Sequence, residues 1–288
     1  MLADPTFLAL ASALCFGLAL VLTQFGFRLM TPAQATLIAV PSSTLLLWLL
    51  SPWLVDWQGF ATRPALIFAG VGLLYPAAVT LLTFLANRRM GPNVAGALGN
   101  LAPLFALLLA AILFGEVPSA WQGAGVAAII LGVALISWTR ERGEGAWPWW
   151  AVALPLGAAA VRGIIQPISK LGLALWPSPF AAVLVSYTVS SAIIIGAGSL
   201  GSGARAPLKP AGVAWFVVIG WCNVAAVAFL YAALAHGSVT LVSPLVSTYP
   251  LATLALSAAL LRAERIDLRL AGAVALTVAG VIILIAAR

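Results

Sequence analysis

Long apolar runs alternate with short polar breaks along this chain, and the pattern predicts membrane-spanning helices. A helix needs roughly 20 mainly apolar residues to cross the hydrocarbon core of a bilayer. Runs of about that length lie at 5–27, 34–54, 64–87, 92–115, 118–138, 148–173, 178–199, 210–235, 238–261 and 267–286. Most breaks are too short to hold a domain outside the membrane. The sequence therefore predicts an all-α membrane protein with ten transmembrane helices.

The pattern of the first half returns in the second half. The stretch from Gly91 to Gly132 corresponds to the stretch from Gly237 to Gly280, and Pro103 and Pro250 match at a spacing of 147 residues. Self-similarity at a fixed spacing indicates an internal repeat. We therefore expect two copies of one five-helix unit.

We expect the first five-helix repeat to cover residues 1–139 and the second to cover 147–288, with 140–146 as a linker. Because five is an odd number, the second repeat starts from the opposite side of the membrane, so the repeats are inverted. Carriers built from inverted repeats bind their substrates near the bilayer midplane, where the repeats meet. A central cavity between the halves is the expected site.

Composition excludes several classes of protein. The chain is 63% hydrophobic and 7% charged, whereas about a quarter of the residues of a soluble domain are charged. The net charge of +7 comes without a basic stripe, so a nucleic-acid partner is not expected. Cys15 and Cys222 fall within apolar runs, which predicts small buried side chains rather than a disulfide. We see no metal-ligand cluster, phosphate loop or catalytic triad, and so expect no cofactor and no enzymatic activity.

Lysine and arginine are distributed unevenly between the two sets of loops. Loops after odd-numbered runs hold ten of the 14, against three on the opposite side if Lys170 is counted there. Positive charge accumulates in cytoplasmic loops. The bias predicts that both termini lie outside. We expect the membrane to be a bacterial inner membrane. Nothing in the pattern requires more than a monomer.

Residues near the ends of the runs resemble the drug/metabolite transporter superfamily, in particular its EamA-type exporters. The resemblance is carried by Pro103, Gly115-Glu116, Gly125 and Leu131-Gly132-Val133 in the first half, and by Pro250, Glu264, Gly272 and Gly280-Val281 in the second, where Ala263 replaces the expected glycine. It covers the whole chain and implies export of amino acids or other small metabolites through a central cavity. Within the family, the chain looks similar to the aromatic amino acid exporters. Many members are drawn with cytoplasmic termini, opposite to the charge bias.

The acidic residues limit how transport can be driven. All seven lie at the ends of runs or in loops, whereas proton-coupled exporters of the small four-helix kind use a carboxylate within the membrane. His236, at the end of the eighth run, is expected to cap a helix. We therefore expect facilitated diffusion or exchange.

Arg162 is the charged residue deepest within an apolar run. A guanidinium in hydrocarbon is costly, so it should face protein or water, with a substrate carboxylate as one partner. Gln166 and Lys170 follow at four-residue spacing on the same face, and Pro167 should interrupt the helix. In the alternative, the helix starts later and Arg162 extends to the interface.

Two matched pairs of residues lie near the centre of the fourth and ninth runs. Asn100 precedes Pro103 by three residues, and Ser247 precedes Pro250 by three, followed by Tyr249 in the ninth run. A proline removes one backbone hydrogen bond and kinks a helix. We expect these polar groups to line the cavity. The alternative is a kink with interhelical hydrogen bonds.

At a spacing of 146, Tyr75 corresponds to Trp221 and Ala77 to Asn223. Aromatic rings at mid-depth could hold a planar substrate, so we expect Tyr75, Trp221 and Asn223 at the cavity, with ordinary packing as the alternative. The sequence thus predicts an amino acid exporter working by alternating access. The rivals are an organic-phosphate or nucleotide-sugar exchanger and a lipid-processing membrane enzyme.

Overall fold

The structure, a computed structural model, describes residues 4–90, 98–139, 148–200, 208–261 and 268–287, and all regular elements within these ranges are helical. They are α1 (Pro5–Gly26), α2 (Pro32–Leu54), α3 (Thr62–Leu74), α4 (Ala77–Met90), α6 (Ala102–Phe114), α7 (Ala120–Thr139), the short 3-10 helix η1 (Trp149–Val152), α8 (Ala153–Leu175), α9 (Pro179–Leu200), α10 (Pro210–His236), α11 (Val239–Val246), α12 (Tyr249–Leu261) and α13 (Leu268–Ala286). Eight helical stretches in these ranges are long and apolar enough to cross a membrane. Two shorter apolar helices, Ala102–Phe114 and Ala120–Leu135, complete the ten expected spans.

The third span is broken, which the sequence pattern did not predict. Tyr75 adopts an extended conformation between α3 and α4, with φ −128° and ψ 131°. Pro76 has no backbone N–H, so it cannot continue the hydrogen bonding of α3. The hydroxyl of Ser190 in α9 accepts a hydrogen bond from the N–H of Ala77 at 3.0 Å. The first N–H group of α4 therefore finds its hydrogen-bond acceptor in the other half of the chain.

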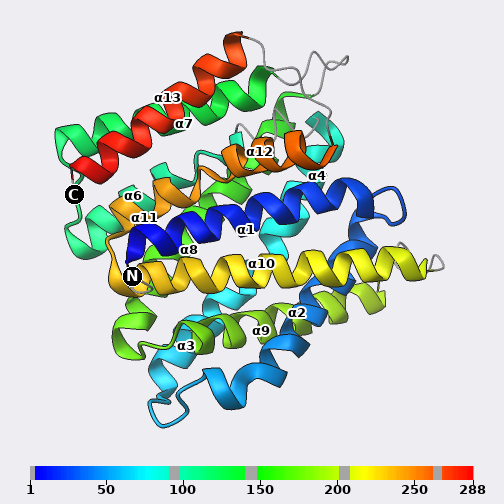
Figure 1. The fold of residues 1–288 in the computed structure, drawn as a ribbon. Helices are drawn as coiled ribbons and strands as arrows, with labels where there is room; N and C mark the ends of the chain where they lie inside the picture. The colour runs from blue at the N-terminus through cyan, green and yellow to red at the C-terminus, as the bar shows by residue number, and fades with distance from the viewer. Residues whose placement is uncertain (1–3, 91–97, 140–147, 201–207, 262–267, 288) are drawn as a thin grey trace.

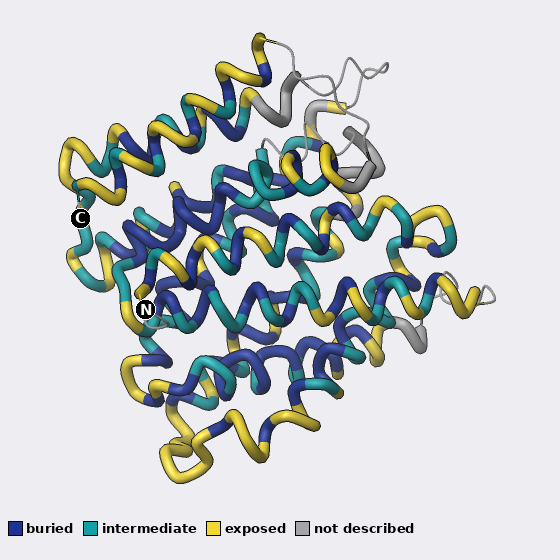
Figure 2. Tube along the Cα trace, viewed as in Figure 1, coloured by how far each residue is buried: buried dark blue, intermediate teal, exposed yellow. Residues whose placement is uncertain are grey.

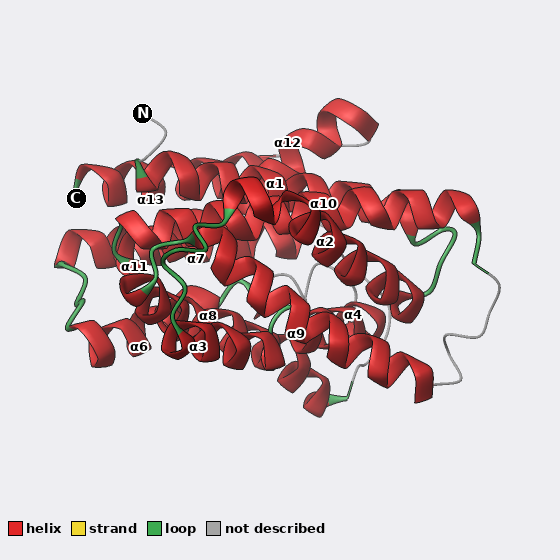
Figure 3. Ribbon diagram, turned by 90° about the horizontal axis from the view of Figure 1, so that it is seen from below, coloured by secondary structure: helices red, strands yellow, loops and turns green. Residues whose placement is uncertain are grey.

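The helices form two layers that are related by exchange of the halves. Figure 3 shows α1, α10 and α2 along one side and α8, α3 and α9 along the other. The contact of α1 with α10 corresponds to that of α8 with α3 and α4, and the contact of α1 with α12 to that of α8 with α6. The pairs α2–α9 and α7–α13 each join equivalent helices. This contact pattern is the two-repeat architecture. The linker 140–146 lies outside the described residues, so the repeat boundaries stay a prediction.

Glycine contacts repeat in the two halves and fix their register. A Cβ on Gly17 of α1 would lie 2.7 Å from the Cβ of Ala252 in α12, and one on Gly163 of α8 would lie 2.7 Å from the Cβ of Phe105 in α6. Gly17 and Gly163 are 146 residues apart, and Phe105 and Ala252 are 147 apart. The same close helix crossing is therefore built twice.

A second pair of glycine contacts fixes the register of α3 against α10. A Cβ on Gly72 would lie 2.6 Å from the carbonyl oxygen of Ser186 in α9, and Gly220 packs in the same way on the carbonyl oxygen of Ala39 in α2. Ala39 and Ser186 are 147 residues apart, but Gly72 and Gly220 are 148 apart. The correct spacing for α3 and α10 is therefore 148.

Helices α7 and α13 lie side by side along one edge of the molecule (Figure 1). Gly125 and Gly280 let the two backbones approach closely, since a Cβ on either would meet the carbonyl oxygen of the other at less than 3 Å. Figure 2 shows exposed residues along the outer faces of this pair. Large apolar side chains such as Leu131 and Ile282, 58% and 62% exposed, suit a lipid surrounding.

Candidate functional site

Arg162 lies near the middle of α8, which begins at Ala153 and ends at Leu175. The helix starts slightly later than the run predicted, nine residues before the arginine. The residues one to three turns away on its face are buried, namely Pro155, Ala158, Ala159, Gln166, Ser169 and Leu173. Arg162 itself is half-buried. The cation therefore lies on the face of α8 that points into the bundle, and among the described residues no carboxylate pairs with it.

Buried polar groups follow Arg162 along α8. The side-chain N–H of Gln166 donates to the carbonyl oxygen of Arg162 at 3.3 Å, but its Oε1 has no hydrogen-bond partner among the described residues. The hydroxyl of Ser169 lies close to that of Tyr231. The helix continues through Pro167, contrary to the expected interruption, although the carbonyl of Gly163 loses its usual intrahelical donor. Buried polar groups normally have partners, so the unpaired Oε1 calls for an explanation.

The prolines of the fourth and ninth spans begin new helices rather than kinking continuous ones. Pro103 and Pro250 are the second residues of α6 and α12. A fixed φ and a missing N–H are well tolerated at that position, because the first turn has no intrahelical acceptors for its N–H groups. The turns before them contain Asn100 and Ser247. The expected kinks are therefore helix breaks, at equivalent places in the two repeats.

Asn100 is 2% exposed, and within the described ranges neither its Oδ1 nor its Nδ2 has a hydrogen-bond partner. Ser247 donates to the carbonyl oxygen of Ser243 at 3.0 Å, and the hydroxyl of Ser243 is itself unpaired. Helices α6 and α11 are in contact, so the two breaks approach each other where the repeats meet. The amide group of Asn100 and the hydroxyl group of Ser243 are therefore available for hydrogen bonding in the bundle interior.

Trp221 does not lie where the sequence predicted. With the spacing of 148, Tyr75 is equivalent to Asn223, and Trp221 is equivalent to Leu73. Trp221 and Leu73 are 44% and 59% exposed, whereas Tyr75 is 6% exposed. Residues two apart point about 200° away from each other on a helix, so the shift of two residues turns Trp221 to the opposite face. Asn223, which is half-buried, is the member of α10 that corresponds to Tyr75.

Three tyrosines are buried together in the interior. Tyr75, Tyr187 and Tyr231 are 6%, 2% and 0% exposed and belong to the same cluster of buried residues. Sequence reasoning missed Tyr187 and Tyr231, although a polar ring within an apolar run is a usable signal.

Phe16 is the equivalent of Arg162 in α1, since both residues come directly before the glycine of the repeated crossing. Ala9, Ser12 and Ala13 share its face and are buried, so Phe16 also points into the bundle. Its ring lies 6.3 Å from the ring of Tyr249, at an angle of 60°. The interior therefore has a cation on one side of the symmetry axis and an aromatic pair on the other.

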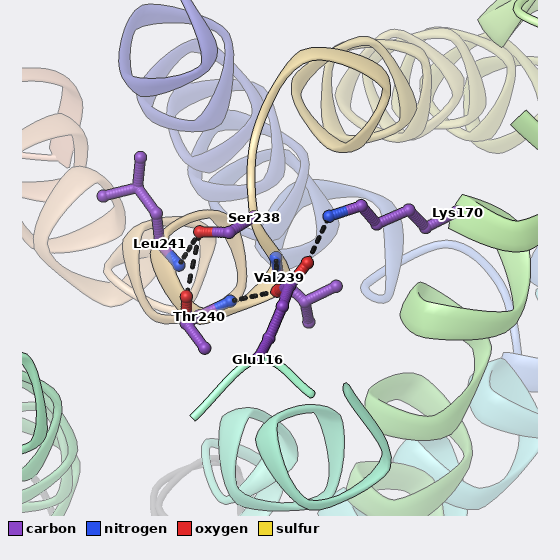
Figure 4. A network of polar contacts seen from close by, with 6 residues as sticks. All are labelled: Glu116, Lys170, Ser238, Val239, Thr240 and Leu241. Carbon is purple, nitrogen blue, oxygen red and sulfur yellow. Dashed lines mark hydrogen bonds and ion pairs between the residues drawn. The ribbon is translucent and has the colours of Figure 1, made fainter. Parts of the chain in front are cut away.

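Glu116 joins the two repeats at the end of the bundle that holds both chain termini (Figure 1). Figure 4 shows its carboxylate between Lys170 of α8 and the first turn of α11. Oε1 accepts from Nζ of Lys170, and Oε2 accepts from the N–H of Val239 at 2.7 Å and of Thr240 at 3.4 Å. The side chains of Glu116 and Lys170 are only 18% and 21% exposed. The sequence analysis did not identify this pair.

The remaining candidates lie at the surface or outside the helices. His236 is the last residue of α10 and is exposed, as a capping position requires. The described acids Asp4 and Asp56 flank helices; Glu264 lies outside the described residues. Cys15 and Cys222 are free and half-buried, less buried than expected. Within the described ranges, no group of three or more His, Cys, Asp or Glu side chains could hold a metal ion.

Comparisons with known proteins agree with this architecture. The family model described as the EamA-like transporter family matches residues 5–138 and 149–286. A search of curated proteins gives no match. Among solved structures, 29 chains match, and one crystal structure superposes with a TM-score of 0.77 at 19% identity, covering 97% of this chain and 95% of that chain. At such an identity the likeness establishes the fold alone.

Proposed function

Because the chain belongs to the EamA-like transporter family, and so is an integral membrane transporter, we propose that it exports amino acids with apolar or aromatic side chains across the bacterial inner membrane. Transport proceeds by alternating access, with the halves moving about a site between them. The observation that carries the proposal is the position of Arg162 on the inward face of α8, without a carboxylate partner among the described residues.

An unpaired guanidinium in the bundle interior favours a ligand that brings its own negative charge. Arginine binds carboxylates through two parallel hydrogen bonds, and charge pairing offsets part of the cost of holding the cation inside a membrane. The unpaired carbonyl oxygens of Asn100 and Gln166 are acceptors suited to an α-ammonium group. Each such contact contributes about 1 kcal/mol net. A zwitterion meets all three groups.

The other end of the substrate is assigned to the contact between α1 and α12. Phe16 and Tyr249 supply an aromatic surface across the symmetry axis from Arg162. Aromatic pairs of this kind contribute about 0.5–1.5 kcal/mol beyond the burial of apolar area. A substrate with a carboxylate at one end and a flat or apolar side chain at the other uses both sides of the site.

The rival functions fit the described residues less well. An exchanger of organic phosphates would be favoured by two free cations in the interior, but Lys170 is already paired with Glu116. A lipid-processing enzyme would need acids, histidines or serines gathered at one interface, which the described residues do not supply. Facilitated diffusion or exchange is favoured because the described acids Asp4, Asp56 and Glu116 lie outside the helices.

The experiment is uptake into proteoliposomes from a panel of labelled amino acids, sugar phosphates and cationic dyes. We expect uptake of neutral and aromatic amino acids, reduced at least tenfold in Arg162→Gln, as the loss of a charged hydrogen-bonding partner implies. Lys209→Gln removes an exposed cation before α10 and should leave uptake unchanged. Uptake of sugar phosphates or dyes alone would overturn the proposal.

A further inference from the structure

Helix α11 is the most completely enclosed helix of the described bundle. Every residue from Val239 to Val246 is buried, although α11 lies at the end of the bundle where the chain termini also lie (Figure 1). It contacts α1, α6, α8 and α10, which come from both repeats. The helix therefore closes the interior at this end. Ser247 and the break before α12 follow directly after it in the chain.

The first turn of α11 is capped by its own Ser238, whose hydroxyl accepts from the N–H of Leu241, and by one carboxylate from the other repeat. Glu116 follows α6 in the first repeat, whereas Lys170 and α11 belong to the second. The same carboxylate binds the ammonium group of Lys170 and the first two N–H groups of α11. Helix termini favour negative charge at these N–H groups, and charged hydrogen bonds are stronger than neutral ones. Glu116 thus ties α8 and α11 together.

We propose that Glu116 is the latch of a gate that closes this mouth of the transport pathway. While the carboxylate bridges Lys170 and α11, solute in the interior cannot leave past α11. Release of the latch lets α11 and α8 separate, which opens the site to the side of the chain termini. The proposal rests on the proposed function only for the identity of the solute that passes the gate. The movement of α11 away from α8 does not depend on that function.

The lysine that Glu116 binds has no charged counterpart at the equivalent position of α1. Lys170 of α8 corresponds to Gln24 of α1 at the spacing of 146 that the glycines fix. Two inverted repeats would open equally to either side if they were identical. The ion pair therefore biases the protein toward the state that is closed at the termini, and its strength sets how rarely that mouth opens.

Accessibility of a buried cysteine tests the gate without any substrate. In a background with Cys15→Ala and Cys222→Ala, Ser247→Cys serves as the reporter below α11, and its reaction with an impermeant thiol reagent is followed in sealed membrane vesicles. A separate variant, Ser119→Cys, identifies the vesicle orientation that exposes the Glu116 side, because Ser119 is exposed on that side.

From the Glu116 side we expect Ser247→Cys to react slowly, and about tenfold faster when Glu116→Gln is added, as the loss of charged hydrogen bonds implies. Lys170→Gln should act in the same direction and carries the test if Glu116→Gln does not fold. Asp56→Asn, which removes an acid on the same side outside the network, should leave the rate unchanged.

An unchanged reaction rate in a folded Glu116→Gln or Lys170→Gln protein would overturn the gate. This result is separate from the proposed function, because the labelling needs no transported solute. If the Glu116→Gln protein opens as expected but transports no amino acid, the role of Glu116 stands and the proposed substrate is wrong.

Discussion

The hydroxyl oxygens of Thr44 and Ser191 lie 2.7 Å apart, and the two residues are equivalent members of the two repeats, 147 positions apart. A residue can contact its own counterpart only near the symmetry axis, so this hydrogen bond marks where the axis passes between α2 and α9. Thr44 also contacts the carbonyl oxygen of Tyr187 at 3.1 Å. The axis thus passes close to the buried tyrosines.

The pair gives a prediction for stability. Thr44→Val or Ser191→Ala leaves a buried hydroxyl without one partner, and each should lower the free energy of unfolding by about 1–3 kcal/mol. The double variant should cost less than the sum, because both halves of the bond are removed together. Thermal unfolding of the purified protein measures this; additive losses would show that the two hydroxyls act independently.

Neutral polar residues at the helix breaks should matter for transport rather than for folding. Asn100→Ala and Ser247→Ala remove a small polar group, so flux of a confirmed substrate should fall several-fold, at about 1 kcal/mol per net hydrogen bond, with normal expression and monodispersity. Trp221→Leu, on the exposed face of α10, is the matched control and should keep its flux. Wild-type flux in both alanine variants would assign these residues a structural role.

The equivalence of Phe16 and Arg162 allows an exchange of the two residues. Arg162→Phe should abolish uptake, because the carboxylate loses its cation. Adding Phe16→Arg returns the cation to the symmetry-related place and should restore a measurable part of the uptake. Proteoliposome flux of the two single variants and the double variant decides this. If the double variant is no better than Arg162→Phe alone, the two sides of the site are not interchangeable.

Transport should not depend on protons. Among the described residues no carboxylate lies within a helix of the bundle, so uptake should proceed without an imposed pH gradient and approach equilibrium. Counterflow and flux are measured with and without a protonophore. Concentrative uptake that collapses with the protonophore would contradict this and direct attention to His236.

The charge bias makes a prediction about orientation. Single cysteines at positions 143 and 203 should react with impermeant reagents only from the cytoplasmic side, whereas Ser119→Cys should react only from outside. Labelling of intact cells and of inverted vesicles distinguishes the two arrangements. The opposite pattern would place both termini in the cytoplasm and leave the fold unchanged.

Hydropathy and the repeat were enough to predict the ten spans, because burial in lipid imposes the same apolar length on each helix. The register was harder. Aligning glycines at a single spacing of 146 paired Tyr75 with Trp221, but loops that differ in length shift the spacing to 148 in this helix pair, and the packing of Gly72 and Gly220 was needed to detect it.

Contacts between distant side chains could not be predicted from periodicity. Glu116 and Lys170 are 54 residues apart, and several other lysines and arginines along the chain were equally possible partners for Glu116. Phe16 could have been found, since it stands opposite Arg162 in the repeat. Polarity alone does not identify Phe16, because a phenylalanine is as apolar as the other residues of its run.

The close pairing of α7 with α13 has a consequence for biosynthesis. α7 contacts α13 more extensively than any other helix, yet α13 is synthesised more than 100 residues after α7. Likewise, α1 packs mainly on α10 and α12, which are made late. The first repeat, once inserted, therefore waits in the membrane with its main partners still missing. The two repeats mature as one unit, and a chain that stops before Leu268 would leave the glycine-lined face of α7 open to lipid.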